Sequence, residues 1–288
     1  MTKEKEYISD DDVVVIGGSD WKPKKGSERP NRWKITAFIL AGILVVAGLF
    51  YIGRHIKHSR EFTQSRYAED IIAALEIPMK GKAGITLLSE ETMGVKLKIY
   101  RLNGLKAHFA DTVPDYTDST IYLVTRSSDY KIIGDRKEII GDYIVDGKVV
   151  EKSNWRAGFM AIVDGNAQIG IDRSSKVSKH VKENKGSMFR QLALVSAGIS
   201  CDKQFILKGK VTRCAYARER NGNLYFVETE NPETLYGFAD ALKEYGFTDA
   251  IYITGGKQPN LFYRTEDGTA HGNYIDNKPH ELVVWIKQ

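Results

Sequence analysis

The residues best placed to do chemistry lie between Thr254 and Lys257, directly after a short apolar segment. Gly255 and Gly256 leave backbone N–H groups unshielded by side chains, and such groups can surround an anion. Lys257 would add a positive charge beside them, so a phosphate is the ligand that this stretch suits. An ordinary turn followed by a solvated lysine is the alternative interpretation.

Three arginines are further candidates for an anion site, because a guanidinium group can bind phosphate through two parallel hydrogen bonds. Arg213 and Arg218 lie on or near one predicted strand, and Arg156 lies in a loop-like segment. Because side chains alternate along a strand, Arg213 and Arg218 should point to opposite faces of the sheet. Only one of the two can therefore face a site lined by that sheet, and a surface role is the alternative for each arginine.

The sequence lacks the patterns that mark several common sites. The six histidines make no metal-binding spacing with acidic or cysteine partners. Residues 13–18 contain two glycines but no third glycine opening a helix, so the dinucleotide-binding pattern is absent. We therefore predict neither a metal nor a cofactor.

A helix between two strands is the most clearly marked element. Segments 224–229 and 250–254 have β character, and 232–245 carries apolar residues at helical spacing. Asn231 suits the position that caps the start of the helix, and Gly246 suits its end. This order predicts a βαβ unit with parallel strands, and ligands often bind where such strands end.

The rest of the chain from about residue 93 is dominated by short β segments. Asp146-Gly147 and Asp164-Gly165 are typical two-residue hairpin turns. The predicted strands and hairpins lie at 95–102, 119–126, 142–150 and 159–171. These segments predict an α+β fold, with a mixed β-sheet, flanking helices and the βαβ unit near the C-terminus.

A run of 18 uncharged residues, 35–52, precedes this domain. As a helix it would be roughly 27 Å long, close to the thickness of the hydrocarbon core of a bilayer. A cleaved signal peptide is the alternative, but the run is long and a poor cleavage site follows it. The predicted organisation is a disordered basic tail (1–34), a single-pass transmembrane helix (35–53), a juxtamembrane helical segment (54–92) and the β-rich domain (93–288).

The distribution of charge bears on location and partners. Residues 1–60 contain 11 Lys and Arg against 7 Asp and Glu, whereas the rest contains 31 against 30. A nucleic-acid-binding domain would concentrate basic charge on its folded part, so we predict no nucleic-acid partner. More basic residues precede the apolar run than follow it, which favours a cytoplasmic N-terminus. The β-rich domain would then lie outside the cytoplasm, in a periplasmic or extracellular location.

Cys201 and Cys214 flank a stretch that resembles two short strands meeting at a turn. A hairpin can bring its ends within disulfide reach, and an exported compartment would favour oxidation. Two unrelated thiols are the alternative, and the sequence favours neither.

From about residue 93 the order of segments resembles that of the phosphodiester glycosidase family. The similarity is greatest in "RCAYARERNGNLYFVETENPETLYGFADALKEYGFTDAIYITGG", which matches an Arg-x-Ala-x-Gly strand, a hairpin, a strand, a helix and a strand ending in Leu-Asp-Gly-Gly. Upstream, "GDYIVDGKVV" and "RAGFMAIVDGNAQIGI" resemble the family's preceding hairpins. The stretch "RSSDYKI" lies where the family has Asn-Gly-Gly-Phe-Phe.

The resemblance implies roles for particular positions. Arg213 matches the family's site arginine, and Gly255 and Gly256 match its glycine pair. Thr254 replaces the family's aspartate, and a threonine is a poor general acid, base or metal ligand. The resemblance implies a hydrolase of a sugar phosphodiester, and the apolar run before the domain predicts that it is membrane-anchored at the cell envelope. The alternative is a non-catalytic relative that binds an anionic or phosphorylated glycan, or a protein partner.

Overall fold

The computed structural model describes residues 32–60, 65–79, 81–134, 136–152, 157–200, 209–253, 260–272 and 281–288. Contacts divide the chain into two units, Met1–Ile56 and Lys57–Gln288, and each is treated by itself. The helices are α1 (Arg32–Arg60), α2 (Ala68–Leu75), α3 (Lys176–Glu183) and α4 (Leu235–Tyr245).

Helix α1 is the described part of the first unit. It continues beyond the uncharged run into charged residues on both sides, over 29 residues in all. Among the described residues no helix combines the length and apolarity needed to cross a membrane. The transmembrane helix predicted at 35–53 is therefore not supported. The tail 1–34 lies almost wholly outside the described residues.

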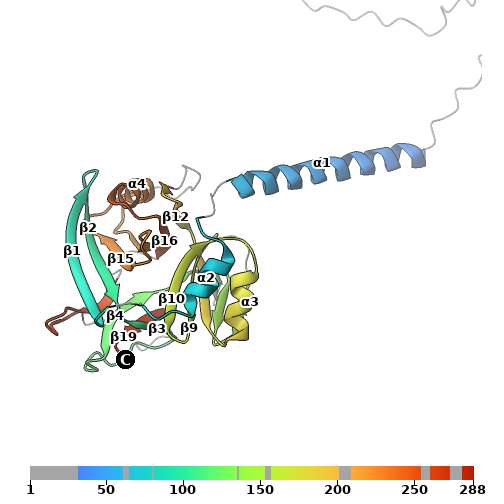
Figure 1. Ribbon diagram of the computed structural model, residues 1–288. Coiled ribbons are helices and arrows are strands. Elements are labelled where there is room, and N and C mark those ends of the chain that lie inside the picture. The colour runs from blue at the N-terminus through green and yellow to red at the C-terminus, as the bar shows by residue number, and fades with distance from the viewer. Residues whose placement is uncertain are drawn as a thin grey trace, which may run out of the picture. The chain divides into compact units, whose positions relative to one another are not determined.

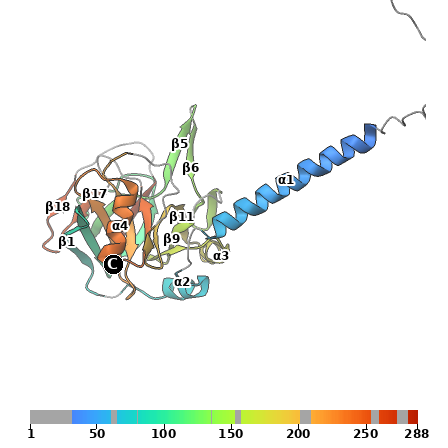
Figure 2. The same ribbon diagram turned by 90° about the horizontal axis from the view of Figure 1, so that it is seen from above.

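The second unit is built on three larger sheets and a separate hairpin (Figure 1). The seven-stranded sheet has the order β1 (Gly84–Thr92), β2 (Val95–Asn103), β15 (Leu224–Thr229), β14 (Cys214–Arg218), β16 (Asp249–Ile253), β12 (Ala193–Ser196) and β13 (Ile199–Ser200). One five-stranded sheet has the order β10 (Asn166–Ile171), β9 (Gly158–Val163), β11 (Ser187–Gln191), β7 (Tyr143–Val145) and β8 (Lys148–Glu151). The other has the order β18 (Ala270–His271), β17 (Asn260–Arg264), β4 (Ile121–Arg126), β19 (Leu282–Ile286) and β3 (Lys106–Ala110). The hairpin pairs β5 (Asp129–Ile133) with β6 (Arg136–Ile140), and Figure 2 shows it projecting away from the larger sheets.

The α+β class is confirmed, but the predicted βαβ pairing is wrong. Strands β15 and β16 are not neighbours, because β14 lies between them and pairs antiparallel with both. They run in the same direction without hydrogen bonding to each other. Every strand pairing among the described residues is antiparallel, so the mixed sheet predicted from the βαβ unit is corrected to an antiparallel one.

Local signals predicted the elements well. Asp146 and Gly147, and likewise Asp164 and Gly165, have positive φ, as a type I′ hairpin turn requires. Gly246 ends α4 in the left-handed conformation at φ 113°. The start of α4 differs from the prediction: Thr234 caps it, and its Oγ1 accepts a hydrogen bond from the Gly237 N–H at 3.0 Å.

The described residues of 54–92, the predicted juxtamembrane helical segment, contain the end of α1, helix α2 and then strand β1. Helix α2 packs through Ile71 and Leu75, both fully buried, against one face of the sheet that contains β9 and β11. Strand β1 then pairs along its whole length with β2. The pairing extends the seven-stranded sheet, so the residues from 84 onward contribute directly to the fold.

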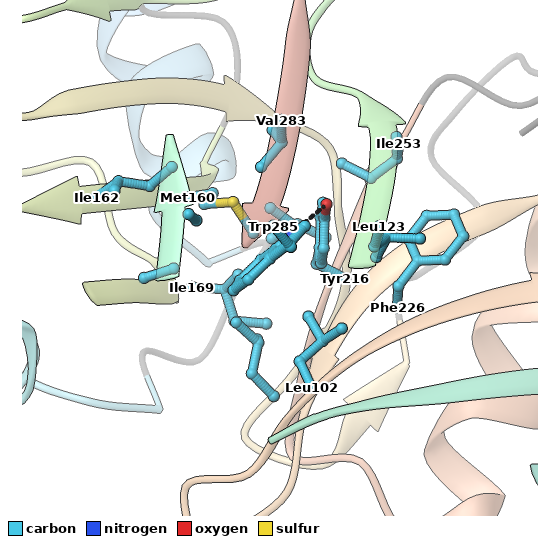
Figure 3. Packing of buried hydrophobic residues seen from close by; sticks show 14 of the residues in the cluster. Leu102, Leu123, Met160, Ile162, Ile169, Tyr216, Phe226, Ile253, Val283 and Trp285 are labelled. Carbon is cyan, nitrogen blue, oxygen red and sulfur yellow. Dashed lines mark hydrogen bonds between the residues drawn. The ribbon is translucent and has the colours of Figure 1, made fainter. Parts of the chain in front are cut away.

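The largest core cluster lies between the three sheets (Figure 3). Trp285 of β19 is fully buried there, and its indole Nε1 donates to the Tyr216 hydroxyl at 2.8 Å. Thr125 of β4 lies 2.6 Å from the same hydroxyl. Because Tyr216 belongs to β14, these hydrogen bonds hold the end of β4 against the middle of the seven-stranded sheet. Helix α4 covers the opposite face of that sheet, through Leu235, Phe238 and other apolar residues.

Candidate functional site

The ends of three neighbouring strands meet at one edge of the seven-stranded sheet. Cys214, the first residue of β14, pairs with Glu228 near the end of β15 and with Ile253, the last residue of β16. Arg213 directly precedes Cys214. It therefore lies beside the point where β16 ends and the predicted anion-binding stretch begins.

The residues of that stretch, Thr254, Gly255, Gly256 and Lys257, lie outside the described residues, as does Arg156. Their predicted roles stay predictions. The structure does place the end of the preceding strand, and it brings that end to Arg213.

Arg213 is a buried residue whose guanidinium group is already engaged. It is 4% exposed, its Nε donates to the Glu233 carbonyl at 3.0 Å, and its Nη2 donates to the Gly209 carbonyl at 3.0 Å. Its Nη1 lies 3.5 Å from the Tyr252 hydroxyl, and its Cζ lies 5.9 Å from the centre of that ring. Arg213 therefore joins the chain before β14, the start of α4 and β16.

The predicted alternation along β14 is confirmed. Ala215 and Ala217 pack in the cluster beneath α4, whereas Cys214 and Tyr216 point into the core between the sheets. Arg218 lies at the far end of the strand and contacts Asp249 rather than anything at the Arg213 end.

Cys214 is fully buried, and its Sγ lies 3.3 Å from the carbonyl oxygen of Ile253. Burial raises the pKa of the Cys214 thiol well above its usual range, and the negative charge of Glu228 raises this pKa further. A thiol in such surroundings is a poor nucleophile. Its predicted disulfide partner, Cys201, lies outside the described residues, so that pairing stays a prediction.

The structure adds one carboxylate that the sequence reasoning missed. Glu228 is 6% exposed, and its Oε1 accepts a hydrogen bond from the hydroxyl of fully buried Tyr100 at 2.6 Å. The sequence does indicate this position. Leu224, Phe226 and Glu228 follow one another at a spacing of two residues, and the first two point into the core. An acidic residue at the next inward position of such a strand is a candidate for a functional carboxylate.

Two aromatic rings connect this carboxylate with the surface. The Tyr100 ring meets the Tyr263 ring edge-on at a centroid distance of 5.0 Å, and Tyr263 stacks on exposed His271 at 4.5 Å. Desolvation raises the pKa of the Tyr263 hydroxyl, and the charge of Glu228 adds to this increase. The Tyr263 hydroxyl therefore interacts electrostatically with the Glu228 carboxylate.

Positive charge lies near the same point. The charges of Arg126 and Arg213 also act on the Cys214 thiol, and they offset part of the increase in its pKa. Arg126 is the last residue of β4 and the first of the "RSSDYKI" stretch. The fold thus brings the start of that stretch to the edge where β14 begins and β16 ends. Within the described part of the chain, no cluster of three His, Cys, Asp or Glu side chains could hold a metal ion.

Comparisons with known proteins give a distant similarity of fold. No family model and no curated protein matches the sequence. Among solved structures, the zebrafish N-acetylglucosamine-1-phosphodiester alpha-N-acetylglucosaminidase catalytic domain, auto-inhibited by its pro-peptide, is 15% identical with a TM-score of 0.46. The match covers 78% of this chain and 94% of that one. A hypothetical protein from Synechocystis is 11% identical with a TM-score of 0.45, over 71% of this chain and 62% of that one.

Proposed function

We propose that the domain hydrolyses a sugar phosphodiester at the edge where β4, β15 and β16 end and β14 begins. The observation that carries the proposal is the buried carboxylate of Glu228, held by Tyr100 at 2.6 Å, with the charge of Arg126 nearby. The resemblance of the sequence to phosphodiester glycosidases supplies the class of substrate. Glu228 would supply the carboxylate that the family has at the position of Thr254.

Each group has a role in this proposal. Glu228 accepts a proton from the attacking water, whose oxygen forms a bond to the glycosidic carbon. The bond from that carbon to the phosphate oxygen breaks, and the phosphate leaves with the electron pair. Arg126 and Lys257 stabilise the negative charge that builds on the leaving oxygen. Tyr100 fixes the orientation of the Glu228 carboxylate and is a positioning residue.

The test is release of the phosphate ester from a panel of sugar-1-phosphodiesters by the full-length protein. Glu228→Gln should lower kcat by about 10²-fold or more, since general acid–base catalysis contributes about that much. Tyr100→Phe should lower kcat by a smaller factor and leave KM nearly unchanged. Glu230→Gln is the matched control, because Glu230 is an exposed acid directly after the same strand. Turnover that survives Glu228→Gln would reject the assignment.

A second function is favoured by the contacts of Arg213. The residue that matches the family's site arginine donates to two backbone carbonyls, so less of its guanidinium group is left for a phosphate. Without Arg213 on the leaving phosphate, a domain that binds an anionic or phosphorylated glycan through other cations such as Arg126, and does not cleave it, fits this observation. Calorimetric binding of a sugar phosphate, with no turnover of any phosphodiester in the panel, would select this function over hydrolysis.

We also propose a lipid bilayer as a partner of the chain. The large apolar side chains of α1 are exposed, among them Phe38 at 78%, Leu44 at 71% and Phe50 at 71%. Exposed apolar surface of this extent is covered in most proteins by a partner or by lipid. Full-length protein should float with liposomes in a density gradient, and replacing Leu44 and Phe50 by lysine should reduce flotation.

The predicted location outside the cytoplasm is the remaining part of this proposal. Protease added to cells whose outer envelope has been removed should then degrade the β-rich domain, whereas protection of the domain until the inner membrane is lysed would reject that location.

A further inference from the structure

A buried side-chain amide lies close to the point where β16 ends. Gln191 is the last residue of β11 and is fully buried. Its Oε1 accepts a hydrogen bond from the N–H of Leu192 at 2.9 Å, which fixes the orientation of the amide. Its Nε2 is buried and makes no hydrogen bond in the described part of the chain. The proposed hydrolysis assigns no role to this residue.

An amide nitrogen without an acceptor destabilises the folded state, so buried amides are normally paired. Asn166, the other buried side-chain amide among the described residues, is paired at both ends. Its Nδ2 donates to the Leu75 carbonyl at 2.9 Å, and its Oδ1 accepts from Lys106 at 2.9 Å. The two N–H groups on the Nε2 of Gln191 are therefore suited to an acceptor that the folded chain does not supply.

The strand pairing places Gln191 at the end of β16. The Tyr252 N–H donates to the Leu192 carbonyl at 2.8 Å. Because this segment pairs antiparallel with β16, the residue before Leu192 lies opposite the residue after Tyr252. Gln191 therefore lies beside Ile253, the last residue of β16, from which the chain enters 254–257.

The same cross-strand row contains the carboxylate of the proposed active site. Cys214 pairs with Ile253 on one side and with Glu228 on the other. The side chains of Cys214 and Ile253 point into the core between the sheets. Gln191 points to this face too, because Leu192 packs on the α4 side and side chains alternate along the chain. The row therefore has a polar side chain at each end and two apolar ones between them.

The length of this row suits a sugar ring. Neighbouring strands lie about 4.8 Å apart, so three strand spacings separate the Cα atoms of Gln191 and Glu228 by roughly 14 Å. A sugar bound at the end of β16 would lie between these two side chains, with the carboxylate on one side and the amide on the other.

We propose that Gln191 is a substrate-binding residue that donates a hydrogen bond to a hydroxyl oxygen of the sugar. The inference rests on the proposed function, since it places the sugar beside Glu228. The amide is neutral, so it suits a neutral oxygen, whereas a phosphate favours charged donors such as Arg126. A site built to donate to one hydroxyl discriminates against sugars that lack it. Gln191 therefore contributes to the choice of sugar.

The test combines two measurements on the full-length protein. Turnover of the panel of sugar-1-phosphodiesters gives kcat and KM, and titration calorimetry with the 1-phosphates of glucose, galactose and mannose gives affinities without turnover. Gln191→Glu keeps an acceptor for the Leu192 N–H but removes both donors. It should raise KM and weaken binding at least about tenfold, with a smaller effect on kcat.

Two further variants control for the added charge. Gln191→Met is neutral and should show the same loss, which would exclude repulsion between a new carboxylate and the phosphate. Gln168→Glu is the matched control, because Gln168 is a half-buried amide that already accepts from Arg66 at 3.0 Å. It should change neither KM nor affinity.

Deoxy analogues separate a direct contact from a structural role. One deoxy analogue of the best-binding sugar phosphate should bind the wild type at least about tenfold more weakly than its parent. Gln191→Met should bind this analogue and the parent equally, since the hydrogen bond is absent in both cases. A residue that only holds the Leu192 N–H would instead weaken the binding of every analogue by the same factor.

The outcomes distinguish this inference from the proposed hydrolysis. Turnover with KM unchanged in both Gln191 variants would reject the role of Gln191 and leave hydrolysis standing. Binding that depends on Gln191, without turnover of any phosphodiester, would support the inference and reject hydrolysis. An equal loss for every deoxy analogue, or no binding of any sugar phosphate to the wild type, would overturn the inference.

Discussion

The two ends of β14 carry the same residue type in opposite situations. Arg213 donates to the carbonyls of Glu233 and Gly209 and links three segments of backbone. Arg218 makes one ion pair, with Asp249, and its buried Nε lacks a partner among the described residues. Arg213, the arginine expected to bind an anion, therefore holds the backbone together. Arg218 has a buried N–H donor that makes no hydrogen bond within the described residues.

The comparison shows that the type and spacing of a residue do not say whether its polar groups are available. A donor of the side chain is available to a ligand only if no carbonyl group from another segment of the folded chain already accepts a hydrogen bond from it. At the Arg213 end, the chain before β14, the chain before α4 and Tyr252 of β16 all contact the guanidinium group. At the Arg218 end, the partner is the buried carboxylate of Asp249.

The largest effect should come from breaking the ion pair at the Arg218 end. Arg218→Leu leaves the Asp249 carboxylate buried without its partner, which should cost about 3–5 kcal/mol of unfolding free energy. Adding Asp249→Leu removes the unpaired charge and should recover most of the loss. Urea unfolding of both variants, followed by the fluorescence of buried Trp285, measures this. A double variant as unstable as the single one would contradict it.

Arg213→Leu should cost less, about 1–3 kcal/mol, because it removes hydrogen bonds to two carbonyl groups. The Glu233 carbonyl keeps the Val211 N–H as a donor at 3.2 Å. The partners are backbone atoms, so no second substitution of a partner side chain can restore the loss. This lack of rescue is the sharpest difference expected between the two ends. Arg213→Lys should recover part of the stability, since one ammonium cannot reproduce the fork. Urea unfolding is again the measurement, and a stable Arg213→Leu variant would show that the residue is not structural.

Thr234→Ala should cost about 1 kcal/mol through loss of the cap at the start of α4. The cap lies next to the carbonyl that accepts from Arg213, so this change tests the Arg213 end alone. Thr234→Ser keeps the hydroxyl and should retain most of the stability. Thermal unfolding of the two variants distinguishes them, and equal melting temperatures would argue against the cap.

The smallest effect should be a change in the acid dependence of stability. The Thr234 N–H donates to Glu233, and this bond, together with nearby Lys210, lowers the pKa of the Glu233 carboxyl. A lowered pKa contributes stability above the ordinary value of 4.5 that is lost as the pH falls below it. Glu233→Gln should flatten the decrease of stability over this acid range. A curve of unchanged slope would show that Glu233 contributes nothing there.

Many elements of the domain could be predicted because their signals are local. The positive φ angles at Asp146 and Asp164 follow from the Asp-Gly pairs, and the end of α4 follows from Gly246. Side-chain alternation along β14 was predicted for the same reason, since it depends only on the geometry of a strand. The cap was misplaced because Asn231 and Thr234 both have the chemistry of a capping residue.

The sequence by itself determined the α+β class, the hairpin turns, the helix α4 and the opposite orientation of Arg213 and Arg218. Only the tertiary structure decided that β14 lies between β15 and β16, that Glu228 is buried beside Tyr100, and that Arg213 is held by backbone carbonyls. The physical reason is distance along the chain. Turns and caps depend on neighbouring residues, whereas strand order and the partners of a buried charge depend on segments that meet only after folding.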